Sequence, residues 1–139
     1  MPPEPHRPRA RPRDRGARAV GARHVTERPP VFTDERGTLL PIELDDVPFA
    51  VRRVFVVHGA EDAPPRGGHV VPCDELVVLV CGSATFRVGC GEDERTVLLG
   101  DQGQQVLLRP GEHVTYELDG PGSAILVLAS EPFRPKDER

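Results

Sequence analysis

The sequence has no long hydrophobic run, no helical periodicity and no closely spaced pair of cysteines. Because no stretch reaches about 18 consecutive apolar residues, we predict no transmembrane helix. The first residues lack an apolar segment, so we expect no secretory signal peptide. No stretch repeats its apolar residues every 3.6 positions over ten residues, which argues against amphipathic helices.

The three cysteines, Cys73, Cys81 and Cys90, are odd in number and have no C-x-x-C spacing. This pattern argues against a disulfide framework and against a zinc site of the usual spacing. We therefore expect three reduced thiols, mostly buried, in a cytoplasmic protein.

Charge is distributed unevenly along the 139 residues, a length typical of one domain. Residues 1–30 contain seven prolines and eight arginines, with a net charge of +5 and almost no large apolar side chains. Such a composition cannot bury enough surface to offset chain entropy, so we predict a disordered segment. The remaining residues carry a net charge of −9, which would repel phosphates and disfavours nucleic acid as a partner.

After residue 30 the chain consists of short runs rich in Val, Leu, Ile, Thr or Phe, bounded by Gly, Pro or Asp. Such runs, spaced about ten residues apart, are typical of the strands of a β-sandwich or barrel. The predicted strands are 38–43, 51–58, 68–71, 75–81, 84–90, 95–99, 105–109, 113–118 and 124–129, with turns at 34–37, 90–94 and 119–122. We predict an all-β fold, an antiparallel β-barrel or jelly roll over residues 31–133, followed by a C-terminal tail over 134–139.

One segment in this region, 65–82, carries most of the chemical information. His69 is followed six residues later by Glu75, and Glu75 is followed seven residues later by Gly82. This spacing resembles the first motif of the cupins, which reads H-x-H, then Glu after three or four residues, then Gly after six more. Val71 stands at the place of the second histidine.

The second cupin motif places a histidine four residues after a proline that opens a strand. Pro110 is followed at that distance by Val114, while His113 comes one residue early. Because neighbouring strand residues face opposite sides of a sheet, His113 should not join His69 inside a barrel. Only His69 and Glu75 then remain as donors, too few for a cupin metal site, so we expect neither a metal nor another cofactor.

Several stretches with matching spacing point to one branch of the cupins. They are Asp34-Glu35-Arg36-Gly37-Thr38-Leu39, Val47-Pro48-Phe49, Arg53-Val54, Pro65-Arg66-Gly67-Gly68-His69 and Leu126-Val127-Leu128-Ala129-Ser130. Together they resemble the dTDP-4-keto-6-deoxyhexose 3,4-ketoisomerases, the WxcM-like cupins, over residues 33–133. The resemblance implies a metal-free, typically dimeric, cupin-type jelly roll that moves a ketone from C4 to C3 of a nucleotide-linked sugar.

The family motif reads R-G-x-H-A-H, so the resemblance places Arg66 at the family arginine and His69 at the first family histidine. Val71 stands where family members carry the second histidine, which they use in proton shuttling. The family's W-H-E stretch corresponds to residues 113–115, so Val114 replaces that histidine too. The departures therefore concern proton-transfer residues.

The implied reaction needs a base for the proton on C3 and an acid that returns a proton to C4. A histidine, whose ordinary pKa is about 6.5, suits both tasks, and a nearby cation would stabilise the developing oxyanion. We thus predict His69 and Arg66 as catalytic residues. The candidates for substrate binding are Glu75, Arg53, Tyr116 and Arg36.

These residues are compatible with several functions. The first is a nucleotide-sugar 3,4-ketoisomerase of deoxysugar biosynthesis, a homodimer that acts on a dTDP-linked keto sugar. The second is a cupin that binds a nucleotide sugar or another small ligand without catalysis, which Val71 and Val114 favour. The third is an interaction module for a partner enzyme. A fourth, a metal-dependent dioxygenase, is disfavoured by the missing histidines.

Overall fold

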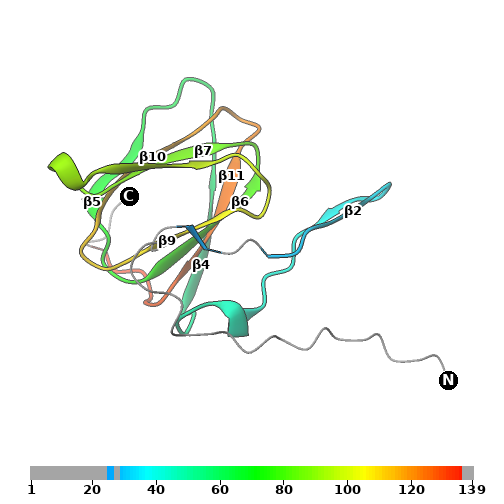
Figure 1. Ribbon diagram of the computed structural model, residues 1–139, viewed down its shortest axis with the longest axis horizontal. Helices are drawn as coiled ribbons and strands as arrows, with labels where there is room; N and C mark the ends of the chain where they lie inside the picture. Colours follow the sequence, from blue (N-terminus) through cyan, green and yellow to red (C-terminus); the bar gives the residue numbers. More distant parts are fainter. Residues whose placement is uncertain (1–24, 27–28, 136–139) are drawn as a thin grey trace.

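The computed structural model describes residues 25–26 and 29–135 of the chain. The described residues form a barrel of two antiparallel sheets, from which one hairpin projects (Figure 1). Most of the segment predicted to be disordered, and residues 136–139 of the predicted tail, lie outside the described residues. Within the described part, no helix is long and apolar enough to span a membrane.

Two sheets make up the walls of the barrel, and every strand pair is antiparallel. The five-stranded sheet has the order β1 (Val25–Thr26), β9 (Gln105–Leu108), β6 (Glu75–Cys81), β11 (Ala124–Ala129), β4 (Arg53–His58). The four-stranded sheet has the order β5 (Arg66–Val70), β10 (His113–Leu118), β7 (Ala84–Val88), β8 (Arg95–Leu99). The described helices are the single 3-10 turns η1 (Leu44–Asp46) and η2 (Gly91–Asp93). The predicted all-β jelly roll is therefore confirmed.

Strand β6 separates two apolar layers. Val77 and Leu79 belong to the core between the two sheets, whereas Leu76 and Val78 belong to a second cluster on the outer face. Val47 and neighbouring apolar residues of the segment 40–51 cover that outer face. A strand covered on both sides is expected to be apolar at successive positions, as β6 is after its first residue, Glu75.

The predicted strands agree with the structure except at the N-terminal side of the barrel. The strands 75–81, 95–99, 113–118 and 124–129 are confirmed with the same bounds. The strand predicted over 38–43 is wrong, because β3 (Gly37–Leu39) ends before Leu40. Leu40 and Ile42 instead pack against the outer face of β6, and Pro41 between them has no backbone N–H for a strand ladder.

The prediction that the cysteines are mostly buried is also wrong. Cys73 is buried, but Cys81 and Cys90 are exposed, and all three thiols are free. Cys81 is the last residue of β6, and Cys90 precedes η2. Both cysteines lie where the chain leaves a sheet, so the apolar runs before them did not indicate their exposure.

The five-stranded sheet extends further toward the N-terminus than the sequence indicates. Val25 and Thr26 lie within residues 1–30, yet as β1 they pair with Val106 and Gln105 of β9. Without this pairing β9 would present unpaired backbone groups at a sheet edge. Residues 25–26, within the segment predicted to be disordered, therefore form part of the five-stranded sheet.

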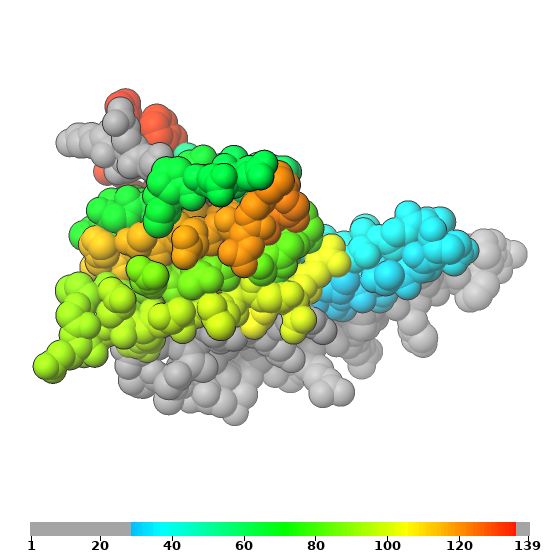
Figure 2. Space-filling view, turned by 90° about the horizontal axis from the view of Figure 1, so that it is seen from above, coloured from blue at the N-terminus to red at the C-terminus, as the bar shows by residue number. Residues whose placement is uncertain are grey.

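The projecting hairpin consists of β2 (Phe32–Asp34) and β3, and we call residues 32–39 the arm. All of its strand residues are exposed. Phe32 and Leu39 face each other across the hairpin and are 57% and 64% exposed. Figure 2 shows the arm, in cyan, extending well beyond the barrel. The turn predicted at 34–37 is confirmed as the tip of this arm.

Strand β5 contains a bulge opposite β10. His69 pairs with Val114, but the next residue of β10, Thr115, pairs with Gly67. Gly68 is therefore an extra residue without a partner on β10. Both glycines have positive φ angles, 87° for Gly67 and 71° for Gly68, which side chains other than glycine rarely adopt.

The bulge places Arg66 and His69 on the same face of the sheet. Arg66 pairs with Tyr116 and His69 pairs with Val114, and both partners belong to the core between the sheets. Directly paired residues share a face. Arg66 and His69 are three positions apart, so a regular strand would have placed them on opposite faces. The bulge thus turns both side chains toward the interior.

We predict that Gly67→Ala is more destabilising than Gly68→Ala. A Cβ at residue 67 would lie 2.7 Å from the carbonyl oxygen of Val114, whereas one at residue 68 would meet open space. Left-handed strain alone should lower the free energy of unfolding by about 1–2 kcal/mol in Gly68→Ala. Strain and overpacking together should lower it by about 2–4 kcal/mol in Gly67→Ala. Urea unfolding measures both, and equal losses would argue against the close approach at Gly67.

Candidate functional site

The side chain of His69 is the most unusual polar group in the barrel. Both ring nitrogens are buried, and neither has a hydrogen-bond partner among the described residues. The ring shares a face with Val114, which is 1% exposed and belongs to the core. A buried polar group without a partner costs about 1–3 kcal/mol, so the site holds an unpaired imidazole at an energetic cost.

Glu75 brings a carboxyl group to the same interior. It is the first residue of β6, and on that strand it alternates in phase with Val77 and Leu79, which line the core between the sheets. Its side chain is 1% exposed. The structure therefore places Glu75 on the interior face, as the cupin motif predicts.

Arg53 lies on the interior face of the same sheet. It pairs with Ala129 of β11, and Ala129 in turn pairs with Glu75 of β6. Residues in one such row share a face, and two strand spacings separate Arg53 from Glu75 by about 10 Å. The Cζ atom of Arg53 lies 4.5 Å from the ring centre of Phe55 and 4.9 Å from that of Phe133.

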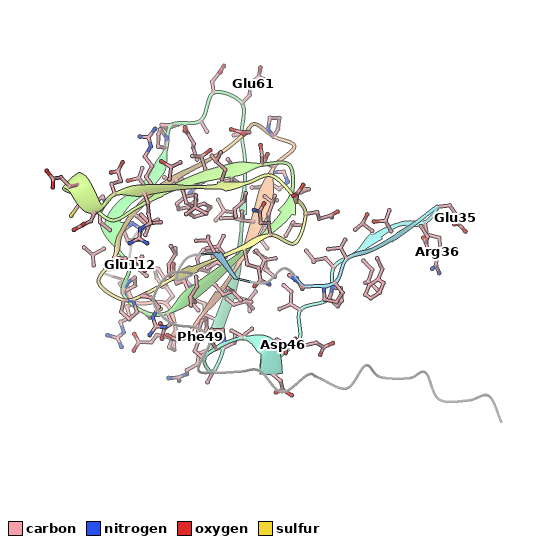
Figure 3. The ribbon with its side chains drawn as sticks, viewed as in Figure 1. Glu35, Arg36, Asp46, Phe49, Glu61 and Glu112 are labelled. Carbon is pink, nitrogen blue, oxygen red and sulfur yellow. The ribbon has the colours of Figure 1, made fainter. Side chains whose placement is uncertain are left out.

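His69, Glu75 and Arg53 lie at the same end of the barrel. The short connections 71–74 and 109–112 join the two sheets at this end. They bind each other, since the Val71 amide donates to the Glu112 carbonyl at 2.8 Å and the Gly111 amide donates to the Val71 carbonyl at 2.9 Å. We call this end the His69 end. In Figure 3, Glu112 marks it, whereas Glu61 marks the opposite end.

The two valines at positions where the sequence resemblance predicted histidines are core residues. Val71 and Val114 are each 1% exposed and pack in the cluster between the sheets. His113, next to Val114, pairs with the exposed Val70 and so lies on the outer face, which confirms that it does not join His69. The two valines add apolar contacts beside His69 and supply no donor atoms.

Tyr116 and Arg66 lie further along the four-stranded sheet, away from the His69 end. Tyr116 stacks on Phe86 in the core, with ring centres 4.9 Å apart and planes at 10°. Arg66 faces the same side as Tyr116 but is exposed at the start of β5. The structure therefore places both predicted residues on the interior face, Tyr116 within the packing and Arg66 at its border.

Arg36 is not brought to the barrel of its own chain. It lies at the tip of the arm, next to Glu35, far from the two sheets (Figure 3). Its guanidinium forms an ion pair with Asp34, and its backbone amide donates to the same carboxylate at 2.8 Å. These hydrogen bonds lower the pKa of Asp34 and raise that of Arg36. Within one chain, the arginine stabilises a turn.

Sequence reasoning missed two features of the site. The Gly67-Gly68 pair between Arg66 and His69 was a signal for a bulge, because adjacent glycines inside a strand often mark one. Phe133 had no such signal, since only the tertiary fold brings the C-terminal segment to Arg53. Within the described ranges, no three His, Cys, Asp or Glu side chains are grouped so that they could hold a metal ion.

Two facing antiparallel sheets with an inward-facing histidine and glutamate define a cupin-type jelly roll. The chain belongs to the WxcM-like, C-terminal family (FdtA), whose model matches residues 24–138. Its structural neighbours include dTDP-sugar 3,4-ketoisomerases and dTDP-sugar 3,5-epimerases. No curated protein matches the chain in sequence.

Three solved structures illustrate the similarity. The sugar 3,4-ketoisomerase QdtA from Thermoanaerobacterium thermosaccharolyticum, in complex with TDP, is 28% identical, with a TM-score of 0.68 over 79% of this chain and 82% of that one. A variant of QdtA in complex with TDP-4-keto-6-deoxyglucose is 25% identical, with a TM-score of 0.70 over 79% and 81%. A 3,4-ketoisomerase from Helicobacter canadensis is 20% identical and shares the fold, with a TM-score of 0.68 over 79% and 84%.

We predict that His69→Leu stabilises the protein in the absence of ligand. Leucine has a similar volume and removes two buried nitrogens that have no partner among the described residues. The free energy of unfolding should rise by about 1 kcal/mol, as measured by urea unfolding. His113→Leu, on the outer face, is the matched control and should have no such effect. A clear loss of stability in His69→Leu would mean that the imidazole is already satisfied.

Proposed function

We propose that the chain binds a nucleotide-linked 4-keto-6-deoxy sugar between its sheets and moves the ketone from C4 to C3. The observation that carries this proposal is the unpaired, buried imidazole of His69 on the interior face. A sugar hydroxyl or carbonyl would give it the partner that the described residues do not. The family match, and the keto sugar bound by the QdtA variant, support the choice of ligand.

The proposed reaction is an isomerisation that needs no oxidant. His69 takes the proton from C3, and the electrons of the broken C–H bond form a C3–C4 double bond as the C4 carbonyl becomes an enolate. A proton passes from the C3 hydroxyl to the C4 oxygen. His69 returns its proton to C4, which leaves a ketone at C3 and a hydroxyl at C4. One imidazole must therefore reach both carbons on one face of the ring.

The other predicted residues have distinct proposed roles. Arg66 faces inward beside Tyr116 and would stabilise the enediolate oxygens with its N–H groups. Glu75 would accept hydrogen bonds from sugar hydroxyls, and Tyr116, stacked on Phe86, would contact the sugar from the interior face. Arg53 would bind the diphosphate, since a guanidinium fork matches phosphate oxygens.

A second candidate function is binding of the nucleotide sugar without catalysis. The observation that favours it is the burial of Val71 and Val114 in the core at the two family histidine positions. Because valine cannot transfer a proton, any proton transfer at these positions would depend on His69.

We predict that the protein exchanges the C3 proton of dTDP-4-keto-6-deoxyglucose for deuterium in heavy water. His69→Ala should lower the exchange rate by about 10² to 10⁴, the usual contribution of a general acid–base group. NMR of the sugar measures the rate, and circular dichroism checks the fold of the variant. An unchanged rate in His69→Ala would refute the assignment.

The variant Val71→His tests the second candidate. If the wild-type protein binds dTDP without exchange and Val71→His gains exchange, the chain is a binding cupin that lacks one proton shuttle. If the wild-type protein neither exchanges the proton nor binds dTDP, both candidates fail.

We also propose that the chain works as a homodimer, with the arm and the outer face of β4 in the interface. Phe32 and Leu39 form an exposed apolar pair on the arm, and an isolated two-stranded hairpin is marginally stable in water. Val54 and Val56 are more than half exposed on β4, which ends the five-stranded sheet. A second copy would cover both surfaces, and the arm would present its Arg36 to that copy.

We predict that Phe32→Asp or Val56→Asp shifts the protein toward the monomer. Burying a charge in an apolar interface is costly, so the dimer should weaken by at least about tenfold. Analytical ultracentrifugation measures the equilibrium, and Leu98→Asp on the other sheet is the matched control. A wild-type protein that is monomeric at high concentration would contradict the proposal.

We propose a cytoplasmic location for this activity. The three cysteines are free in the structure, and two of them are exposed. Exposed thiols are compatible with a reducing compartment, where they do not oxidise readily to disulfides.

A further inference from the structure

The segment after β11 returns to the His69 end of the barrel and contacts Arg53. Two hydrogen bonds anchor its start, because the Ser130 amide donates to the Asp74 carbonyl at 2.9 Å and the Asp74 amide donates to the Ser130 hydroxyl at 3.0 Å. Three residues later, the ring of Phe133 lies 4.9 Å from Cζ of Arg53. In Figure 2 this C-terminal part, in red, lies against the barrel on the side away from the arm.

Phe133 remains largely in contact with solvent, although it is a large apolar side chain. It is 53% exposed, and it belongs to neither hydrophobic cluster among the described residues. Burial of its own surface therefore explains little of its placement. Among the described residues, its specific interaction is the contact with the guanidinium of Arg53.

Aromatic contacts restrict how a guanidinium can bind a ligand. A guanidinium packs on an aromatic ring through its flat face, which leaves the N–H groups at its edge free for acceptors. Arg53 lies near the rings of both Phe55, on its own strand, and Phe133, on the C-terminal segment. Two rings limit the orientation of the Arg53 side chain more than a single ring would. They therefore reduce the entropy lost when a ligand binds.

We propose that Phe133 is a positioning residue, which holds the guanidinium of Arg53 ready for a diphosphate group at the His69 end of the barrel. The inference rests on the proposed binding of a nucleotide sugar. It adds the C-terminal segment to the site, although this segment carries no polar group of the predicted site. Phe133 acts through Arg53, and the proton transfer at His69 does not involve it.

The first test measures the affinity for dTDP and for inorganic pyrophosphate by calorimetry. Phe133→Leu should lower the affinity for both ligands by about two- to fivefold, the range of one cation–π contact. Phe133→Tyr keeps the aromatic face and should restore the affinity. Arg53→Ala should weaken both ligands by about tenfold or more, through loss of the charged hydrogen bonds. Leu98→Ala, at an exposed apolar residue of β8, is the control and should leave both affinities unchanged.

The double variant Arg53→Ala/Phe133→Leu shows whether the ring acts through the guanidinium. We expect Phe133→Leu to have no further effect once Arg53 is absent, because the two residues form one unit. At saturating keto sugar, Phe133→Leu should leave the rate of C3 exchange unchanged and raise only the half-saturating concentration. If Phe133 had a merely structural role, its substitution would not change the half-saturating concentration while leaving the exchange rate at saturation unchanged.

Three results would overturn the inference. If wild-type protein binds dTDP and Phe133→Leu binds it equally well, the ring does not position Arg53, while the proposed function stands. If Phe133→Leu lowers the affinity for dTDP but not for pyrophosphate, and lowers it equally in the Arg53→Ala background, the ring contacts the base directly. If the wild-type protein binds neither ligand, the positioning role and the proposed function fail together.

Discussion

The pairing of β5 with β10 is the constraint on which the candidate site depends. Arg66 and His69 can both face the interior only because Gly68 is an extra residue in β5 and Gly67 lies against the backbone of β10. Positive φ angles at two successive residues give the strand this shape, and glycine adopts them without strain. The bulge thus interrupts the regular pairing of the strand and turns two side chains to the same face. Bulges beside functional sites commonly redirect side chains in this way.

The interior that receives these side chains combines close packing with a few polar groups. Val71 and Val114 belong to the apolar core at the positions where the sequence resemblance predicted histidines, and Glu75 and His69 are polar residues beside them. The two ring nitrogens of His69 have no partner among the described residues, and a buried polar group without a partner lowers stability. The barrel therefore keeps one buried imidazole, the proposed proton-transfer group, in an environment that otherwise favours packing.

Segments outside the central strands complete the barrel from three sides. β1 covers the edge of β9, residues 40–51 cover the outer face of β6, and the C-terminal segment reaches Arg53. The arm projects away from the two sheets (Figure 1), and it carries apolar residues at its base and an Arg36–Asp34 ion pair at its tip. These peripheral segments connect the fold with the ligand and with a second copy in the proposed function.

The sequence by itself determined the all-β architecture, most strand bounds and the residue types of the site. Short apolar runs between glycines and prolines indicate strands directly, and the outward direction of His113 followed from strand periodicity alone. Only the tertiary structure decided that Leu40 and Ile42 leave the sheet, that Cys81 and Cys90 are exposed, and that Phe133 contacts Arg53. The physical reason is that burial depends on what packs against a residue from elsewhere in the chain, whereas the pattern along a strand depends only on its own neighbours.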